Sequence, residues 1–221
     1  MTPKIPLKQR LSDYPQYYAN STPEREAAVL GLHRLNYRDF ADQIDQCAKA
    51  LLVSGIGSGD RAPTLSNPHP IALILFMACA RIGAIWVGLN TRSTYDELAY
   101  IMADAQPGLL FSITEFEGRD YREDLQRLQA GFNSLGKVIL MDRHNKSAFE
   151  GFIDFGAFLT LGKTCSESSF AQAIESVQSD DPVLIVYTSG STGQPKGALL
   201  SHSNIIHSAL TQYHYWHPEP L

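Results

Sequence analysis

Val183-Leu-Ile-Val-Tyr187, followed at once by Thr188-Ser-Gly-Ser-Thr-Gly-Gln-Pro-Lys-Gly197, is the most informative part of this chain. The first run is apolar and β-branched and follows Asp180-Asp181-Pro182, so it predicts a buried strand. The second run predicts a loop of hydroxyl-bearing residues and glycines, whose backbone N–H groups can converge on one concavity. A phosphate group fits such a concavity, and Lys196 adds a positive charge for a polyanion.

This loop differs from the Walker phosphate-binding pattern. Pro195 stands five residues after Gly190, where that pattern would continue with Gly-Lys. The alternative without a ligand is a solvated Gly/Ser turn between two strands. Strand, donor-rich loop and lysine occur here in the order that phosphate binding requires, which favours a nucleotide site of another kind.

The segment from Tyr187 to Gly197, followed by Ser201-His202, resembles the signature loop of the adenylate-forming enzymes. These are the acyl-CoA synthetases, the adenylation domains of peptide synthetases, and the luciferases. The resemblance implies that the loop holds the β- and γ-phosphates of ATP and the leaving pyrophosphate, with Lys196 as the catalytic residue that compensates their charge. The phosphate contacts implied in this way are Thr188, Ser189, Gly190, Ser191, Thr192, Gly193 and Lys196.

Shorter landmarks extend the resemblance from about Thr22 to Asn204. Asn90-Thr-Arg92 together with Glu97-Leu98 favours acyl-CoA synthetases over amino-acid adenylation domains. The implied fold is α/β, a mostly parallel flavodoxin-like sheet flanked by helices, as the first part of the large N-terminal domain of an acyl-CoA synthetase. The other landmarks are Leu35-Asn-Tyr37, Gly59-Asp-Arg61, Arg81-Ile-Gly83-Ala84 and Asp104-Ala-Gln-Pro107.

The activity implied by the resemblance needs several small molecules. A small-molecule carboxylic acid would react with Mg-ATP to give an acyl-adenylate and pyrophosphate, and the thiol of CoA would then take the acyl group. The cofactors implied for the intact enzyme are therefore ATP, Mg²⁺ and CoA.

The length of the family's members sets a limit on this activity. They continue beyond residue 221 with the adenine-binding, magnesium-binding and ribose-binding segments and a small C-terminal domain, so we expect an N-terminal fragment. We expect the fragment to pair with that missing C-terminal portion and to be unable to adenylate alone. The alternatives are a non-catalytic truncated protein that binds a nucleotide or a partner, and a pseudogene remnant.

Composition and charge restrict the class of protein. The 221 residues are 44% hydrophobic, which is enough to bury a core, and the net charge of −5 offers no basic surface for nucleic acid. Cys47, Cys79 and Cys165 show no zinc spacing, and the N-terminus lacks an apolar signal region, so a cytoplasmic location is expected. Arg81 and Gly83 interrupt the apolar run that starts at Ile71, so no membrane span is predicted.

Alternating strand and helix patterns predict βαβ units and a mostly parallel sheet. We expect an irregular entry over 1–22, a first α/β subdomain over 23–180, and the start of a second over 181–221, truncated, with the phosphate-binding loop. Asn36 is expected to cap one helix, and Thr94-x-x-Glu97 is expected to open another as a capping box. Pro63 lacks an N–H, which favours an edge strand or a bulge.

Histidines and phenylalanines gather in two regions of the sequence. The spacing of the histidines suits surface or capping histidines better than a metal site, so no metal ligand is predicted. The phenylalanines are expected to fill the core and not to form an aromatic binding platform. The histidines are His202, His207, His214 and His217, and the phenylalanines are Phe149, Phe152, Phe155 and Phe158.

Overall fold

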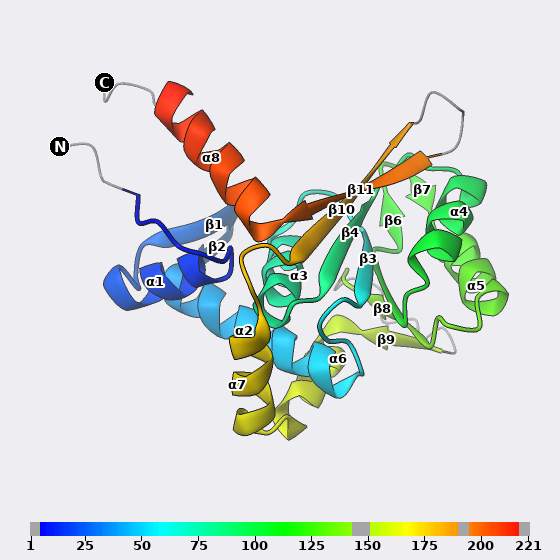
Figure 1. The fold of residues 1–221 in the computed structure, drawn as a ribbon. Helices are drawn as coiled ribbons and strands as arrows, with labels where there is room; N and C mark the ends of the chain where they lie inside the picture. Colours follow the sequence, from blue (N-terminus) through cyan, green and yellow to red (C-terminus); the bar gives the residue numbers. More distant parts are fainter. Residues whose placement is uncertain (1–4, 143–150, 190–194, 217–221) are drawn as a thin grey trace.

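A seven-stranded sheet forms the centre of the computed structural model, which describes residues 5–142, 151–189 and 195–216 (Figure 1). The strand order is β11-β10-β4-β3-β5-β8-β9, and every neighbouring pair is parallel except β10–β11. The five strands β4, β3, β5, β8 and β9 are neighbours in the sheet. When they are renumbered 1 to 5 in chain order, their order across the sheet is 2-1-3-4-5, as in flavodoxin-like sheets, which confirms the predicted fold. The strands are β3 (Arg61–Leu65), β4 (Ile85–Leu89), β5 (Leu109–Ser112), β8 (Lys137–Leu140), β9 (Phe152–Asp154), β10 (Pro182–Ser189) and β11 (Pro195–Ser201).

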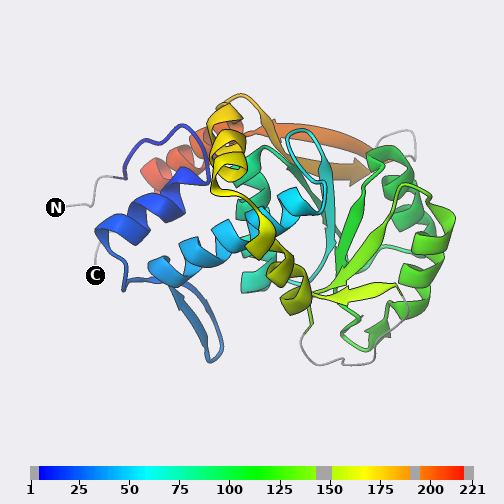
Figure 2. The same ribbon diagram turned by 90° about the horizontal axis from the view of Figure 1, so that it is seen from below.

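Helices cover both faces of this sheet (Figures 1 and 2). Helices α4 and α5 lie on one face, and α2, α3 and α6 lie on the other, where α2 packs against α3 and α6. Helix α8 leaves the end of β11 and projects from the body of the molecule. The helices are α1 (Asp13–Ser21), α2 (Tyr37–Val53), α3 (Pro70–Ile82), α4 (Tyr95–Ala105), α5 (Arg122–Gly131), α6 (Phe155–Leu161), the 3₁₀ turn η1 (Gly162–Thr164), α7 (Glu167–Ser176) and α8 (His202–Trp216).

Two small antiparallel hairpins stand outside the main sheet. One joins β1 (Glu26–Leu30) to β2 (His33–Asn36), and the other joins β6 (Glu115–Phe116) to β7 (Arg119–Asp120).

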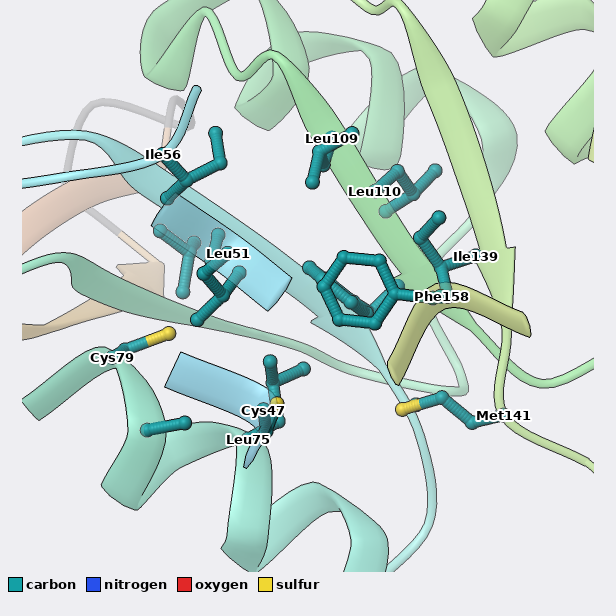
Figure 3. Packing of buried hydrophobic residues seen from close by; sticks show 14 of the residues in the cluster. Cys47, Leu51, Ile56, Leu75, Cys79, Leu109, Leu110, Ile139, Met141 and Phe158 are labelled. Atoms are coloured by element: carbon teal, nitrogen blue, oxygen red, sulfur yellow. The ribbon is translucent and has the colours of Figure 1, made fainter. Parts of the chain in front are cut away.

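The hydrophobic core lies on both faces of the sheet, and Figure 3 shows the part of it between the sheet and the layer formed by α2, α3 and α6. The side chains of Cys47 and Cys79 are fully buried, and burial raises the pKa of both thiols. Core side chains from three helices and two strands meet here: Cys47, Leu51, Leu75, Cys79, Leu109, Leu110, Ile139 and Phe158.

Phenylalanines of the poorly patterned region pack as predicted. The Phe158 ring lies 5.3 Å from the Phe111 ring in a T-shaped arrangement and 6.0 Å from the Phe155 ring, between centroids. Phe158 and Phe155 are buried, and Phe152 is half-buried. Phe149 lies outside the described residues.

Local capping signals locate the starts of two helices. The backbone N–H of Asp39 donates to Oδ1 of Asn36 at 2.8 Å, so α2 begins as expected. Thr94 and Glu97 form the predicted capping box at the start of α4, with bonds of 2.7 and 3.3 Å between side chain and backbone. Such bonds depend on residues three apart in the chain, which is why the sequence shows them.

The edge position or bulge suggested for Pro63 is wrong. Strand β3 is central, and it pairs with β4 in continuous register from Arg61 to Leu65. Its ladder with β5 begins only at Thr64, so the strand accommodates the missing N–H of Pro63 before that ladder starts.

The first segment also differs from its expected irregular conformation. Residues 13–21 form α1, which packs against α2, and the Tyr18 ring lies 4.8 Å from the Tyr37 ring between centroids. A helix with a weak apolar pattern is stabilised here by a tertiary contact, which a local reading of the sequence does not show.

Strands β10 and β11 join the same sheet as β4, so the predicted boundary at residue 181 lies at the start of a strand of the first sheet. The division into 23–180 and 181–221 remains a prediction. Strand β11 is an edge strand and exposes Leu199 at 58%, so it presents an open edge.

None of the helices in the described ranges is both long enough and apolar enough to cross a membrane. The apolar run that begins at Ile71 forms α3 and then, after Gly83, β4. Gly83 adopts a φ of +75° at the end of α3, where the left-handed conformation favours glycine.

Candidate functional site

The β10–β11 hairpin carries the predicted phosphate-binding residues. Thr188 lies opposite Lys196, and Ser189 lies opposite Pro195, in antiparallel register. The structure therefore brings Thr188 and Lys196 together on adjacent strands. The predicted contacts Gly190, Ser191, Thr192 and Gly193 lie outside the described residues.

The direction of β10 relative to its parallel neighbour shows at which end of the sheet β10 terminates. Strand β10 runs parallel to β4, with Leu184 opposite Trp86 and Ile185 opposite Val87. Ser189 therefore lies at the carboxyl end of β10. In open α/β sheets, ligands bind outside the carboxyl ends of the strands, so the position suits a binding loop.

The charge of Lys196 is available to a ligand. Its side chain is exposed, and no carboxylate in the described parts of the chain forms an ion pair with it. Thr188 is exposed as well, so its hydroxyl group is accessible from solvent beside the lysine. A cation and a hydroxyl donor side by side can bind the oxygens of a phosphate group.

One contact of the hairpin was missed by the sequence analysis. The Tyr187 hydroxyl donates to Oδ2 of Asp104, near the end of α4, at 2.5 Å. Burial, together with the hydrogen bond to Asp104, raises the pKa of the Tyr187 hydroxyl. The two residues are far apart in the sequence, and no local pattern indicates that they meet.

His202 at the start of α8 is not a surface residue, and that part of the histidine prediction is wrong. Its side chain is fully buried, and the Leu11 N–H donates to its Nδ1 at 3.1 Å. Burial lowers the pKa of this imidazole. His207 is exposed as predicted, and its Nδ1 lies 2.8 Å from the Ser203 carbonyl oxygen.

Within residues 5–142, 151–189 and 195–216, no set of three or more His, Cys, Asp or Glu side chains is arranged to hold a metal ion. His217 lies outside these ranges, and the side chain of His214 is not described.

Comparison with known proteins identifies a family and several relatives. The sequence model described as "AMP-binding enzyme" matches residues 16–220. The acyl-CoA ligase sidI of Aspergillus fumigatus is 29% identical over 182 residues, which is 80% of this chain and 30% of that protein. A feruloyl-CoA synthase of Amycolatopsis sp. is 29% identical over 197 residues, which is 89% of this chain and 34% of that protein. The chain thus spans about a third of the length of these relatives.

Solved structures share the fold. Acetoacetyl-CoA synthetase from Streptomyces lividans superposes with a TM-score of 0.76 at 23% identity, over 92% of this chain and 32% of that one. The fatty acyl-adenylate ligase from L. pneumophila, in complex with acyl adenylate and pyrophosphate, gives a TM-score of 0.69 at 20% identity. That match covers 96% of this chain and 34% of the ligase.

Proposed function

The chain belongs to the AMP-binding enzyme family, and from this premise we propose that it supplies the ATP-phosphate-binding part of an AMP-forming acid–thiol ligase, an acyl-CoA synthetase. The observation that carries the proposal is the hairpin register, which sets Thr188 beside Lys196 at the carboxyl end of β10. The signature loop lies between these two residues in the sequence.

The proposed reaction has two steps. A carboxylate oxygen attacks the α-phosphorus of ATP, the bond from that phosphorus to the bridging oxygen breaks, and pyrophosphate leaves. The thiolate sulfur of CoA then attacks the acyl carbon, and AMP leaves as the acyl–oxygen bond breaks. Protein groups accelerate phosphoryl chemistry of this kind mainly by positioning and by stabilising charge.

Residues of the loop would stabilise the charge of the leaving group. The Lys196 ammonium would compensate the charge that develops on pyrophosphate, and the Thr188 hydroxyl would donate to a phosphate oxygen. The backbone N–H groups and hydroxyls from Ser189 to Gly193 complete the proposed set of contacts. Mg²⁺ would enter with the nucleotide as Mg-ATP.

The partners of this site are proposed from the same family. They are a small-molecule carboxylic acid, ATP and CoA. Because the chain spans about a third of its relatives, the complete reaction would also require the segments that those relatives contain beyond the match. The β11 edge is a surface on which such a segment could pair.

Titration calorimetry with ATP and with tripolyphosphate tests the binding step on the chain itself. Lys196→Ala should weaken binding about tenfold or more, because charge-assisted contacts contribute about 1.5–3 kcal/mol. Lys137→Ala is the matched control, since this exposed lysine opens β8 at the amino edge of the sheet. If the unaltered chain, Lys196→Ala and Lys137→Ala bind ATP and tripolyphosphate with equal affinity, Lys196 is excluded from the site.

A chimaera tests the catalytic step. Replacing the matching third of the Amycolatopsis feruloyl-CoA synthase with this chain should retain carboxylate-dependent ATP–pyrophosphate exchange, and Lys196→Ala should abolish most of it. A chimaera that folds and binds ATP but shows no exchange would favour the non-catalytic binding protein.

A further inference from the structure

The outer part of the hairpin, residues 186–189 and 195–198, extends beyond its support in the sheet. Strand β10 pairs with β4 only at Leu184 and Ile185, whereas β10 continues to Ser189. Strand β11 has no neighbour on its outer side among the described strands. Val186 is 40% exposed, in keeping with an outer hairpin that stands clear of the sheet (Figure 1).

A single side-chain hydrogen bond ties this outer hairpin to the rest of the described structure. It is the bond from the Tyr187 hydroxyl to Asp104, at 2.5 Å. The end of α4 that carries Asp104 is itself held to β3, because Nε of Arg61 donates to the Ala105 carbonyl oxygen at 2.6 Å. The outer hairpin is thus connected through α4 to the central strand of the sheet.

A glycine on the opposite strand makes room for the tyrosine ring. Tyr187 lies opposite Gly197, and a Cβ atom at Gly197 would lie 3.3 Å from Cζ of that ring. The next pair along the hairpin is Thr188 with Lys196. The anchored pair therefore adjoins the two described residues that are proposed to contact phosphate.

We infer that Asp104 and Tyr187 are positioning residues, which hold the outer hairpin so that Lys196 and Thr188 face a bound polyphosphate. The inference rests on the proposed function of the loop. A tethered hairpin loses less conformational freedom on binding than an untethered one, so the tether favours affinity without touching the ligand.

Hydrogen exchange and calorimetry on the 221-residue chain test this inference. Tyr187→Phe removes the hydroxyl and keeps the ring over Gly197, and Asp104→Ala removes the acceptor oxygens. Each variant should raise amide exchange in the outer hairpin, leave β3 and β4 unchanged, and weaken tripolyphosphate binding about tenfold. The double variant should be no weaker than either single one, because both remove the same bond.

Tyr100→Phe is the control, since this half-exposed tyrosine lies on the same helix as Asp104. It should change neither measurement. Unchanged hairpin exchange in Tyr187→Phe overturns the inference whether or not the chain binds polyphosphate. Binding by the unaltered chain that persists in both variants also overturns it and leaves the proposed function intact. A lack of binding by the unaltered chain refutes the proposed function and, with it, the positioning role.

Discussion

Gly197→Ala introduces a methyl group at a closely packed position of the hairpin. The new Cβ would lie 2.9 Å from Cγ2 of Ile185 and 3.3 Å from Cζ of Tyr187, so either β11 or these side chains must move. Gly197 does not have a positive φ, so the effect comes from this contact and not from the backbone conformation.

The size of the effect follows from two opposing contributions. Overpacking of this kind costs about 1–3 kcal/mol. Replacing glycine also restricts the unfolded chain, which returns about 0.4–1 kcal/mol. We therefore expect a net loss of about 1–2 kcal/mol in the free energy of unfolding.

Urea unfolding followed by tryptophan fluorescence measures this loss. Gly131→Ala is the matched control, because this glycine ends α5 and has no atom within 4 Å of its would-be Cβ. There we expect a gain of up to about 1 kcal/mol. If Gly197→Ala is as stable as the unaltered protein while Gly131→Ala behaves as expected, the close packing of Tyr187 over the hairpin is refuted.

Three further predictions concern buried groups. Burial lowers the pKa of His202 in the folded state, so below its unfolded value of about 6.5 the unfolded chain binds more protons, and the free energy of unfolding falls as the pH falls. Urea unfolding measured from about pH 8 to pH 5 should therefore show a steeper fall in the free energy of unfolding for the unaltered protein than for His202→Gln. Parallel pH dependences of the two proteins would contradict this. Phe158→Ala should lower the free energy of unfolding by about 3–5 kcal/mol, measured in urea, and a loss below about 1 kcal/mol would mean that the ring is not a core residue. Cys165 is half-buried whereas Cys47 and Cys79 are fully buried, so a thiol reagent should modify Cys165 in the folded protein and the other two only on unfolding, and rapid reaction of all three would contradict the core packing.

Features that depend on short stretches of chain were predictable. The caps at Asn36 and at Thr94 follow from residues three apart. The same holds for β10, whose apolar run is contiguous, whereas the phosphate contacts of the signature loop remain a prediction. These signals are visible because the groups that interact are neighbours in the sequence.

Tertiary packing decided the rest of the fold and of the candidate site. The central position of Pro63 depends on which strands flank β3, and the burial of His202 depends on a contact with Leu11. The bond from Tyr187 to Asp104 joins residues far apart in the chain. Each of these depends on the order in which strands assemble into a sheet, and long-range contacts of that kind leave no period or spacing in the sequence. The sequence by itself therefore determined the family and predicted the phosphate-binding residues, whereas only the folded sheet decided that Tyr187 of the hairpin bonds to Asp104.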